Sequence, residues 1–92
     1  MPEVTILIPG ALRRYTREAA EITATGADVR SAIVDAERKH PGLLLSVCDE
    51  TGAQRPHVNL FVNEENVKEM AGLGTRLSPH DVLHIVPSIS GG

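Results

Sequence analysis

The sequence predicts a single α+β domain in which one main helix packs on one face of a mixed sheet of four to five strands. Its 92 residues suit one hydrophobic core. Four short segments alternate apolar and polar residues with a period of two, which is typical of half-buried strands, and one longer segment between them has a helical period. A helix laid across a sheet buries the apolar surfaces of both, so two layers are expected.

The first two strands are predicted over Glu3–Ile8 and Glu18–Thr25. Every second residue of the first strand is apolar and should face the core: Val4, Ile6 and Ile8. Leu7 should therefore lie on the opposite face. The segment Pro9–Arg17 is polar and turn-forming, and Gly26 ends the second strand. We expect the two strands to pair as a hairpin.

The main helix is predicted over Asp28–His40. Its apolar residues are spaced i, i+3, i+4 and i+7, which places them on one face: Val29, Ala32, Ile33 and Ala36. Asp28 is a favourable N-cap, and its charge suits the helix start. Pro41 and Gly42 then break the pattern. A right-handed crossover is expected, because this helix connects the hairpin to the rest of the sheet.

The second half of the chain contains shorter elements. Leu43–Val47 predicts a short helix or turn, and Cys48–Pro56 reads as a loop. Alternation returns in His57–Val62, which predicts a third strand. The following segment turns, and a short edge strand is expected at Val67. A final strand is predicted over Val82–Val86.

The chain ends in Gly91-Gly92, shortly after the final strand. Pairing should fade at Pro87, because proline cannot donate to a sheet ladder. Fully extended, Ser88–Gly92 would span about 17 Å at about 3.4 Å per residue. Two residues without side chains can thread a narrow channel and present the carboxylate of Gly92 to another protein's catalytic atoms. Chain ends are often rich in glycine and disordered, so this dipeptide is weak evidence by itself.

Composition excludes several classes of function. The chain has a net charge of −3 with one Tyr, one Phe and no Trp, so it lacks the cationic surface and stacking rings of a nucleic-acid binder. Its longest apolar run is three residues, which is too short to span a membrane. No secretion signal is visible and Cys48 has no partner, so we expect a cytoplasmic protein held together by packing.

Individual reactive residues offer little chemistry. Cys48 follows an apolar residue and is best interpreted as a packed side chain. The four histidines are too scattered for a metal site: His40, His57, His80 and His84. Because no glycine-rich phosphate-binding motif is present, we expect no cofactor on this chain, and any nucleotide must sit on a partner.

Three segments together carry a family resemblance. They are Val4–Pro9 with the following Leu12-Arg13, Val58–Val67 and Asp81–Gly92. The most specific parts are Phe-Val-Asn followed by two acidic residues, and the terminal Pro-Ser-Ile-Ser-Gly-Gly. With these segments the whole chain resembles the ubiquitin-like sulfur carriers of the β-grasp fold, the MoaD/ThiS type.

The resemblance implies a β-grasp domain over residues 1–87 and a flexible tail over residues 88–92. An E1-like adenylating enzyme would use ATP to activate the carboxylate of Gly92, and sulfur would then replace AMP to give a thiocarboxylate. Gly91 would let the tail thread the partner's channel, and Ser88, Ile89 and Ser90 would contact the partner. The chain would then be a carrier and co-substrate, and its partners would be the enzymes.

The extended middle section, roughly residues 43–57, and the total length look most similar to carriers of the cysteine-biosynthesis (CysO) type. In that type a PLP-dependent cysteine synthase accepts the sulfur, and a zinc metallopeptidase releases the product. Alternatives stay open: a molybdopterin-synthase small subunit, a β-grasp interaction module that is never acylated, and a modifier attached to lysines through Gly92.

A docking surface is expected on the face of the sheet away from the helix. Leu7 and Phe61 should point to this face, and His84 can join them. Arg13 and Arg14 follow the first strand. We interpret them as solvated surface charge, with contact to an acidic partner groove as the alternative.

Overall fold

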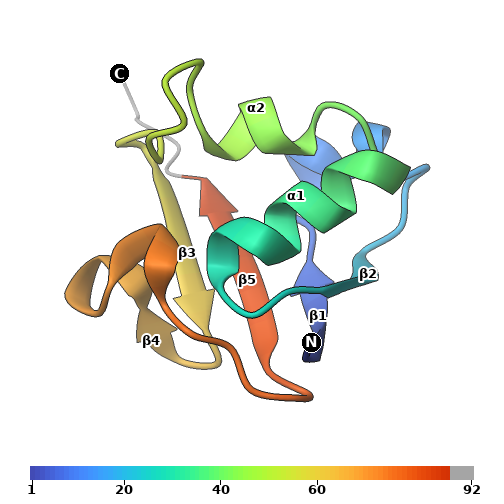
Figure 1. Ribbon diagram of the computed structural model, residues 1–92. Coiled ribbons are helices and arrows are strands. Elements are labelled where there is room, and N and C mark those ends of the chain that lie inside the picture. The colour runs from blue at the N-terminus through green and yellow to red at the C-terminus, as the bar shows by residue number, and fades with distance from the viewer. Residues whose placement is uncertain (88–92) are drawn as a thin grey trace.

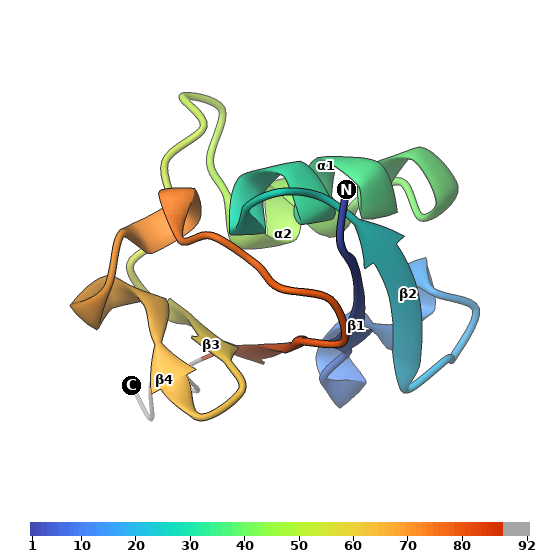
Figure 2. The ribbon, with the colours of Figure 1, turned by 60° about the horizontal axis from the view of Figure 1, so that its bottom comes forward.

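Five strands form one mixed sheet in the order β2-β1-β5-β3-β4, and two helices cover one of its faces (Figures 1 and 2). The computed structural model describes residues 1–87. The strands are β1 (Glu3–Leu7), β2 (Glu21–Thr25), β3 (Val58–Val62), β4 (Glu65–Asn66) and β5 (Val82–Pro87). The expected two-layer architecture is confirmed. The tail predicted over residues 88–92 lies outside the described residues.

The last strand of the chain lies in the middle of the sheet. β5 runs parallel to β1, with Leu7 opposite His84, and antiparallel to β3, with Phe61 also opposite His84. Its inward residues Leu83 and Ile85 are buried. The C-terminal strand is therefore held on both sides.

Pairing continues one residue further than predicted, because Pro87 is still paired with Val58. The N–H of Asn63 donates to the carbonyl of Val82, which marks one hydrogen-bonded position of the β3–β5 ladder. Such positions recur at every second residue, so Val58 and Pro87 face each other at a non-hydrogen-bonded position. The missing N–H of proline therefore removes no hydrogen bond between β3 and β5.

β2 pairs antiparallel with β1 as expected, but it begins at Glu21 and not at Glu18. Arg17 and Glu18 have φ values of 54° and 67°, which are left-handed and incompatible with a strand. Thr16 fixes this turn, because its buried hydroxyl donates a hydrogen bond to the carbonyl of Ala19 at 2.9 Å. A 3₁₀ helix, η1 (Gly10–Tyr15), fills the segment before it.

The main helix α1 spans Val29–Lys39, and its four predicted apolar residues are all buried. Asp28 caps it as expected: Oδ1 accepts hydrogen bonds from the backbone N–H and the hydroxyl of Ser31 at 2.8 and 2.7 Å. These bonds favour the charged form and hold the pKa of Asp28 below its usual value. The short helix α2 spans Leu43–Val47, where a short helix or turn was predicted. At the start of α2, the carboxylate of Glu37 accepts hydrogen bonds from the backbone N–H groups of Gly42 and Leu44 at 3.0 and 2.9 Å.

The predicted edge strand at Val67 was wrong in position. β4 is Glu65–Asn66, whereas Val67 is buried at the start of a 3₁₀ helix, η2 (Val67–Glu69). A further 3₁₀ helix, η3, covers Gly72–Gly74. Cys48 is 2% exposed, so its interpretation as a packed side chain is confirmed. Burial also raises the pKa of its thiol.

Gly26 allows the end of β2 to lie directly against the first turns of α1. A Cβ at this position would approach the carbonyl carbon of Ser31 to 2.8 Å and the Cα of Ala32 to 2.9 Å. Both are backbone atoms, which cannot move aside without shifting the helix. We therefore expect Gly26→Ala to lower the free energy of unfolding by about 1–3 kcal/mol, measured by urea denaturation. Gly74→Ala is the matched control, because nothing lies within 4 Å of its added Cβ. Equal stability of the two variants would contradict the prediction.

Candidate functional site

The described part of the chain ends at Pro87, the last residue of β5 (Figure 1). The predicted tail residues lie outside the described residues: Ser88, Ile89, Ser90, Gly91 and Gly92. Pro87, the residue before them, lies in the middle of the sheet, beside Val58 of β3.

A shallow cavity of about 330 Å³ adjoins the end of β5. It is formed where the first turn of η1 meets the last strand and is lined by Pro9, Gly10, Ala11, His84, Ile85, Val86 and Pro87. Most of these side chains are apolar, so the cavity suits an apolar group of a docking protein.

On the face of the sheet away from the helices, three side chains from neighbouring strands lie in one row. Phe61 of β3 lies opposite His84 of β5, which lies opposite Leu7 of β1. Leu7 and Phe61 are half-buried and His84 is exposed, so the predicted orientation of all three residues is confirmed. Their role in docking stays a prediction. We call these three residues the sheet-face row.

Val82 and Val86 share this outer face and extend the row along β5, because Leu83 and Ile85 point inward. Neither valine was predicted from the sequence to be a docking residue. The alternation that places His84 outward also predicts both valines.

Asn63 has a structural role in the Phe-Val-Asn motif. It occupies a left-handed conformation, with φ 57°, directly after β3. Its Oδ1 accepts the N–H of Val82 at 3.0 Å, and its Nδ2 donates to Oδ1 of Asp81 at 3.1 Å. Its own N–H donates to the carbonyl of Val82 at 2.7 Å. Asn63 therefore clamps the start of β5 to the end of β3.

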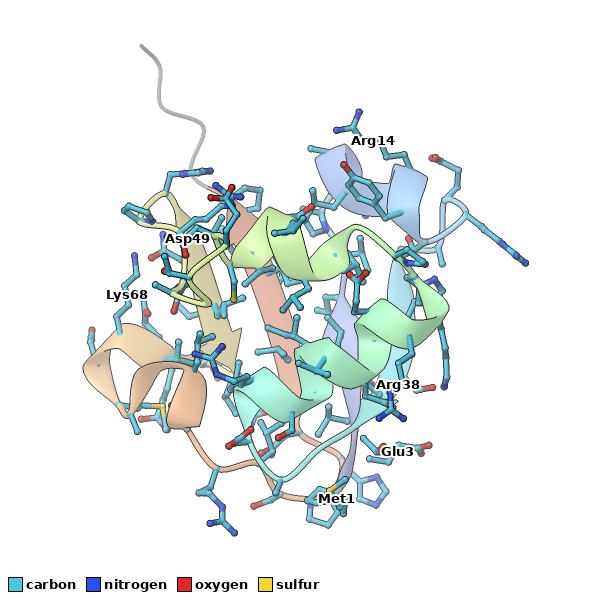
Figure 3. All side chains as sticks on the ribbon, turned by 45° about the horizontal axis from the view of Figure 1, so that its top comes forward. Met1, Glu3, Arg14, Arg38, Asp49 and Lys68 are labelled. Atoms are coloured by element: carbon cyan, nitrogen blue, oxygen red, sulfur yellow. The ribbon has the colours of Figure 1, made fainter. Side chains whose placement is uncertain are left out.

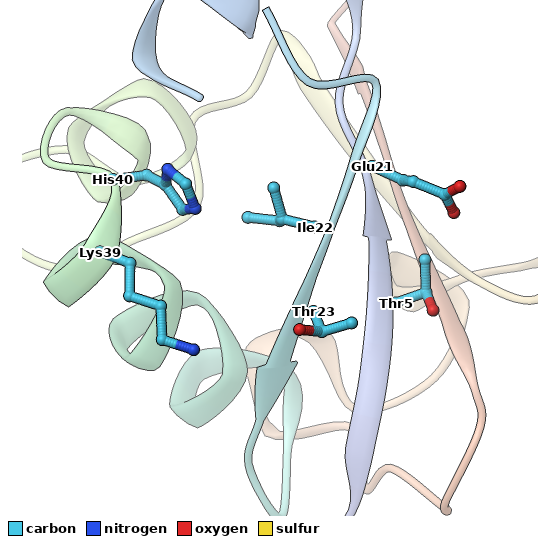
Figure 4. Close-up of a pocket in the computed structure, with 6 residues that line it drawn as sticks. All are labelled: Thr5, Glu21, Ile22, Thr23, Lys39 and His40. Carbon is cyan, nitrogen blue, oxygen red and sulfur yellow. The ribbon is translucent and has the colours of Figure 1, made fainter. Parts of the chain in front are cut away.

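A second surface cavity lies on the other side of the sheet order, at β2. A cavity of about 370 Å³ at the β2 edge combines Lys39 and His40 of the α1 end with Glu21, Ile22, Thr23 and Thr5 (Figure 4). The figure shows Glu21 and Thr5 directed away from the helix. Within residues 1–87, no three metal-ligating side chains gather, and no helix is long and apolar enough to cross a membrane.

Comparison with known proteins identifies the family to which this geometry belongs. Residues 6–92 match the ThiS family. The chain belongs to the ThiS family. It is 32% identical over 91 residues to the sulfur carrier protein CysO of Mycobacterium tuberculosis, covering 97% of this chain and 98% of that protein.

Solved structures agree with this family assignment. The crystal structure of M. tuberculosis CysO superposes with a TM-score of 0.89 at 31% identity, covering 94% of this chain and 99% of the other. A chain of the Amycolatopsis orientalis BexX/CysO complex superposes with a TM-score of 0.91 at 34% identity, covering 97% of this chain and 99% of the other. Small archaeal modifier protein 1 of Methanosarcina acetivorans superposes with a TM-score of 0.84 at 26% identity, covering 100% of this chain and 98% of the other. This ThiS-family chain is therefore a β-grasp, ubiquitin-like sulfur carrier that resembles CysO, and like its relatives it is a carrier protein and not itself an enzyme.

The Asn63 clamp predicts a large effect from a small substitution. Asn63→Ala removes both side-chain hydrogen bonds. It also leaves alanine, which has no polar side chain to stabilise the left-handed backbone, at this position. We therefore expect a loss of about 2–3 kcal/mol in the free energy of unfolding. Asn63→Asp keeps the acceptor for Val82 but turns a carboxylate oxygen toward Asp81, so a loss of about 1 kcal/mol is expected. Urea denaturation measures both.

The neighbouring variant Glu64→Ala serves as control for the clamp, because Glu64 is exposed in the same turn. It should change the free energy of unfolding by less than about 0.5 kcal/mol. A loss for Asn63→Ala no larger than that of this control would show that the clamp contributes nothing.

Proposed function

We propose that this sulfur carrier bears its sulfur as a thiocarboxylate on Gly92. The observation that carries the proposal is the position of β5: its end, Pro87, is fixed in the centre of the sheet, and the sequence continues from there for five residues to Gly91-Gly92. Those residues can reach about 17 Å when extended. The body can therefore remain outside an active site that the C-terminal carboxylate enters.

The chemistry proceeds in two steps on a partner. The Gly92 carboxylate attacks the α-phosphate of ATP on an E1-like enzyme, which forms the acyl-adenylate and releases pyrophosphate. Hydrosulfide then attacks the acyl carbon and displaces AMP, leaving the thiocarboxylate. A side chain on Gly92 or Gly91 would crowd the adenylation site or its channel. In this proposal the nucleotide binds to the partner and not to this chain.

Cysteine synthesis is the acceptor pathway that we propose. The likeness to CysO over nearly the full length of both chains supports this choice. In this pathway the thiocarboxylate sulfur attacks an aminoacrylate on a PLP-dependent cysteine synthase, and a zinc metallopeptidase releases the cysteine. The BexX/CysO complex supports the idea that such carriers act while bound to a second protein. We place the reactions in the cytoplasm, where thiols stay reduced.

A second candidate function is attachment to proteins. The likeness to an archaeal modifier protein at 26% identity favours it, and it would use the same adenylation of Gly92. The activated carboxyl group would then be transferred to a lysine amine in place of sulfur. This outcome would leave isopeptide-linked products, whereas sulfur transfer would leave none.

The sheet-face row is proposed as the surface that docks on the activating enzyme. Leu7 and Phe61 flank His84 on a face that no helix covers, and the row adjoins the cavity beside Pro87. Partly exposed apolar and aromatic side chains at the centre of an interface commonly carry much of its binding energy.

The carrier proposal predicts a mass change at the C-terminus. The protein isolated from its native host should include a species heavier by one oxygen-to-sulfur exchange, and a thiocarboxylate-reactive label should trap it at Gly92. A variant lacking Gly92 is the control and should show only the unmodified mass. A further species heavier by one cysteine residue would support cysteine synthesis. If the protein stays unmodified when an activating enzyme, ATP and sulfide are supplied, the carboxylate carries no sulfur and the proposal fails.

The docking proposal predicts that the double variant Leu7→Ala/Phe61→Ala lowers kcat/KM for adenylation about tenfold. Pyrophosphate release measures the rate. The matched control is Val34→Ala, since Val34 is an apolar residue on the exposed side of α1, 40% exposed. Unchanged kinetics in the double variant, with normal thermal unfolding, would remove the sheet-face row from the interface.

A further inference from the structure

β2 is an edge strand of the sheet, and its hydrogen bonds show which backbone groups point away from that edge. The carbonyl of Ala20 accepts the N–H of Ile8 at 2.8 Å, so the backbone groups of Ala20 face β1. In an antiparallel ladder such groups recur at every second residue. The residues between them direct their N–H and C=O groups outward from the sheet: Glu21, Thr23 and Thr25.

The helix α1 takes the N–H group of only the last of these residues. The N–H of Thr25 donates to Oδ2 of Asp35 at 2.9 Å. Within residues 1–87, the structure shows no such hydrogen bond for the backbone groups of Glu21 and Thr23. Unpaired N–H and C=O groups at a sheet edge are a template for another extended chain. Because Asp35 closes the edge at Thr25, the open segment covers residues 21–23.

The cavity of about 370 Å³ described above lies at this same segment. Glu21, Ile22 and Thr23 line it from β2, and Lys39 and His40 line it from the end of α1. Figure 4 shows Ile22 directed toward the helix and Lys39 extending toward β2. Open backbone groups, an apolar side chain and an ammonium group are therefore brought together in one groove.

These features specify an extended peptide as the occupant. Glu21 and Thr23 can each exchange an N–H and a C=O with one residue of an antiparallel strand. The peptide residue opposite Ile22 must then point toward α1, because residues directly opposite each other share a face. Glutamate suits this position, since its methylene groups can lie on Ile22 while its carboxylate reaches Lys39. A lysine opposite Glu21 would form a cross-strand pair of opposite charge on the other face.

The charge requirement is one carboxylate beside one ammonium, and not a positively charged surface. Glu21 lines the same cavity but is directed away from the helix, so it does not lie between Lys39 and the occupant (Figure 4). Two carboxylates of α1 accept backbone N–H groups elsewhere, Asp35 at Thr25 and Glu37 at the start of α2.

We propose that the open segment of β2 is a second interaction surface, which binds an extended segment of a partner protein as an added antiparallel strand with glutamate opposite Ile22. Such strand addition takes its affinity from backbone hydrogen bonds and its specificity from alternate side chains. β1 separates β2 from β5, so the added strand would extend the sheet and leave β5 uncovered. The inference concerns binding alone and does not depend on sulfur at Gly92.

The first test uses the blocked pentapeptide Thr-Thr-Glu-Lys-Thr, whose glutamate should lie opposite Ile22 and whose lysine should lie opposite Glu21. We expect a dissociation constant of about 1 mM, measured by an NMR titration of the isotope-labelled protein. The amide protons of Glu21 and Thr23 should move downfield, because they gain hydrogen bonds. The isomer Thr-Thr-Lys-Glu-Thr is the matched control and should bind about fivefold more weakly, because it places like charges opposite each other.

N-methylation of the peptide separates strand pairing from simple charge attraction. A methyl group on the nitrogen of the second threonine removes the N–H that would donate to Thr23, so binding should weaken about tenfold. The nitrogen of the glutamate faces away from β2 in the proposed pairing, and its methylation should weaken binding less than about threefold. Both measurements use the wild-type protein, so neither depends on the folding of a variant.

A matched pair of charge reversals tests the wall of the groove. Lys39→Glu should weaken binding of the pentapeptide about fivefold, whereas Arg38→Glu should leave it within about twofold of the wild type. Arg38 is the adjacent residue of α1 but lines a different surface cavity together with Met1, and both residues are labelled in Figure 3. Thermal unfolding confirms that each variant folds.

Four results would overturn the inference. The amides of Glu21 and Thr23 could stay unshifted at about 10 mM peptide, which is well above the expected dissociation constant. The two N-methylated peptides could bind equally, or the two charge reversals could weaken binding equally. Finally, sedimentation could show a dimer that Thr23→Pro dissociates, in which case a second copy of this chain occupies the edge. None of these results bears on the adenylation of Gly92, so the proposed carrier function is tested separately.

Discussion

The central position of β5 is the constraint on which the rest of this structure depends. The strand is hydrogen-bonded to β1 on one side and to β3 on the other, and Leu83 and Ile85 anchor it in the core. A chain end that begins there can be drawn into a partner without peeling an edge strand from the sheet. Pro87 closes the ladder at a position where no β3 hydrogen bond is lost. The residue that precedes the predicted tail is therefore firmly attached in the centre of the sheet.

One strand supplies both buried core residues and part of the proposed docking surface, because its side chains alternate between the two faces. Leu83 and Ile85 point to the helices, whereas His84 and Val86 point to the uncovered face. Cys48 is buried and its thiol pKa is raised, so it is a poor candidate for an intermediate sulfur acceptor. In our proposal the reacting atom is then the carboxylate of Gly92.

Sequence patterns predicted what is set by local periodicity. The burial of Val4 and Ile6, the outward position of Leu7 and the Asp28 cap followed from spacing and residue type, because each depends on neighbours a few residues away. The errors arose where side-chain hydrogen bonds set the backbone. Thr16 fixes the left-handed turn that delays β2, and no alternation reveals it. β4 has only two residues, too few for any period, and the buried Val67 was misplaced into it. The sheet order is a product of tertiary contact, which no local pattern contains.

In the Phe-Val-Asn motif, features set by local alternation and a feature set by side-chain hydrogen bonds lie in consecutive residues. Phe61 faces outward in the sheet-face row, Val62 is buried, and Asn63 clamps the start of β5 through its side chain. A slip of one residue between β3 and β5 would turn His84 inward and move Pro87 away from Val58, because side chains alternate along a strand. The clamp that prevents this slip lies at the opposite end of β5 from the carrier tail. The register that Asn63 sets thus decides both which residues β5 presents on the uncovered face and which residue of β3 lies beside Pro87.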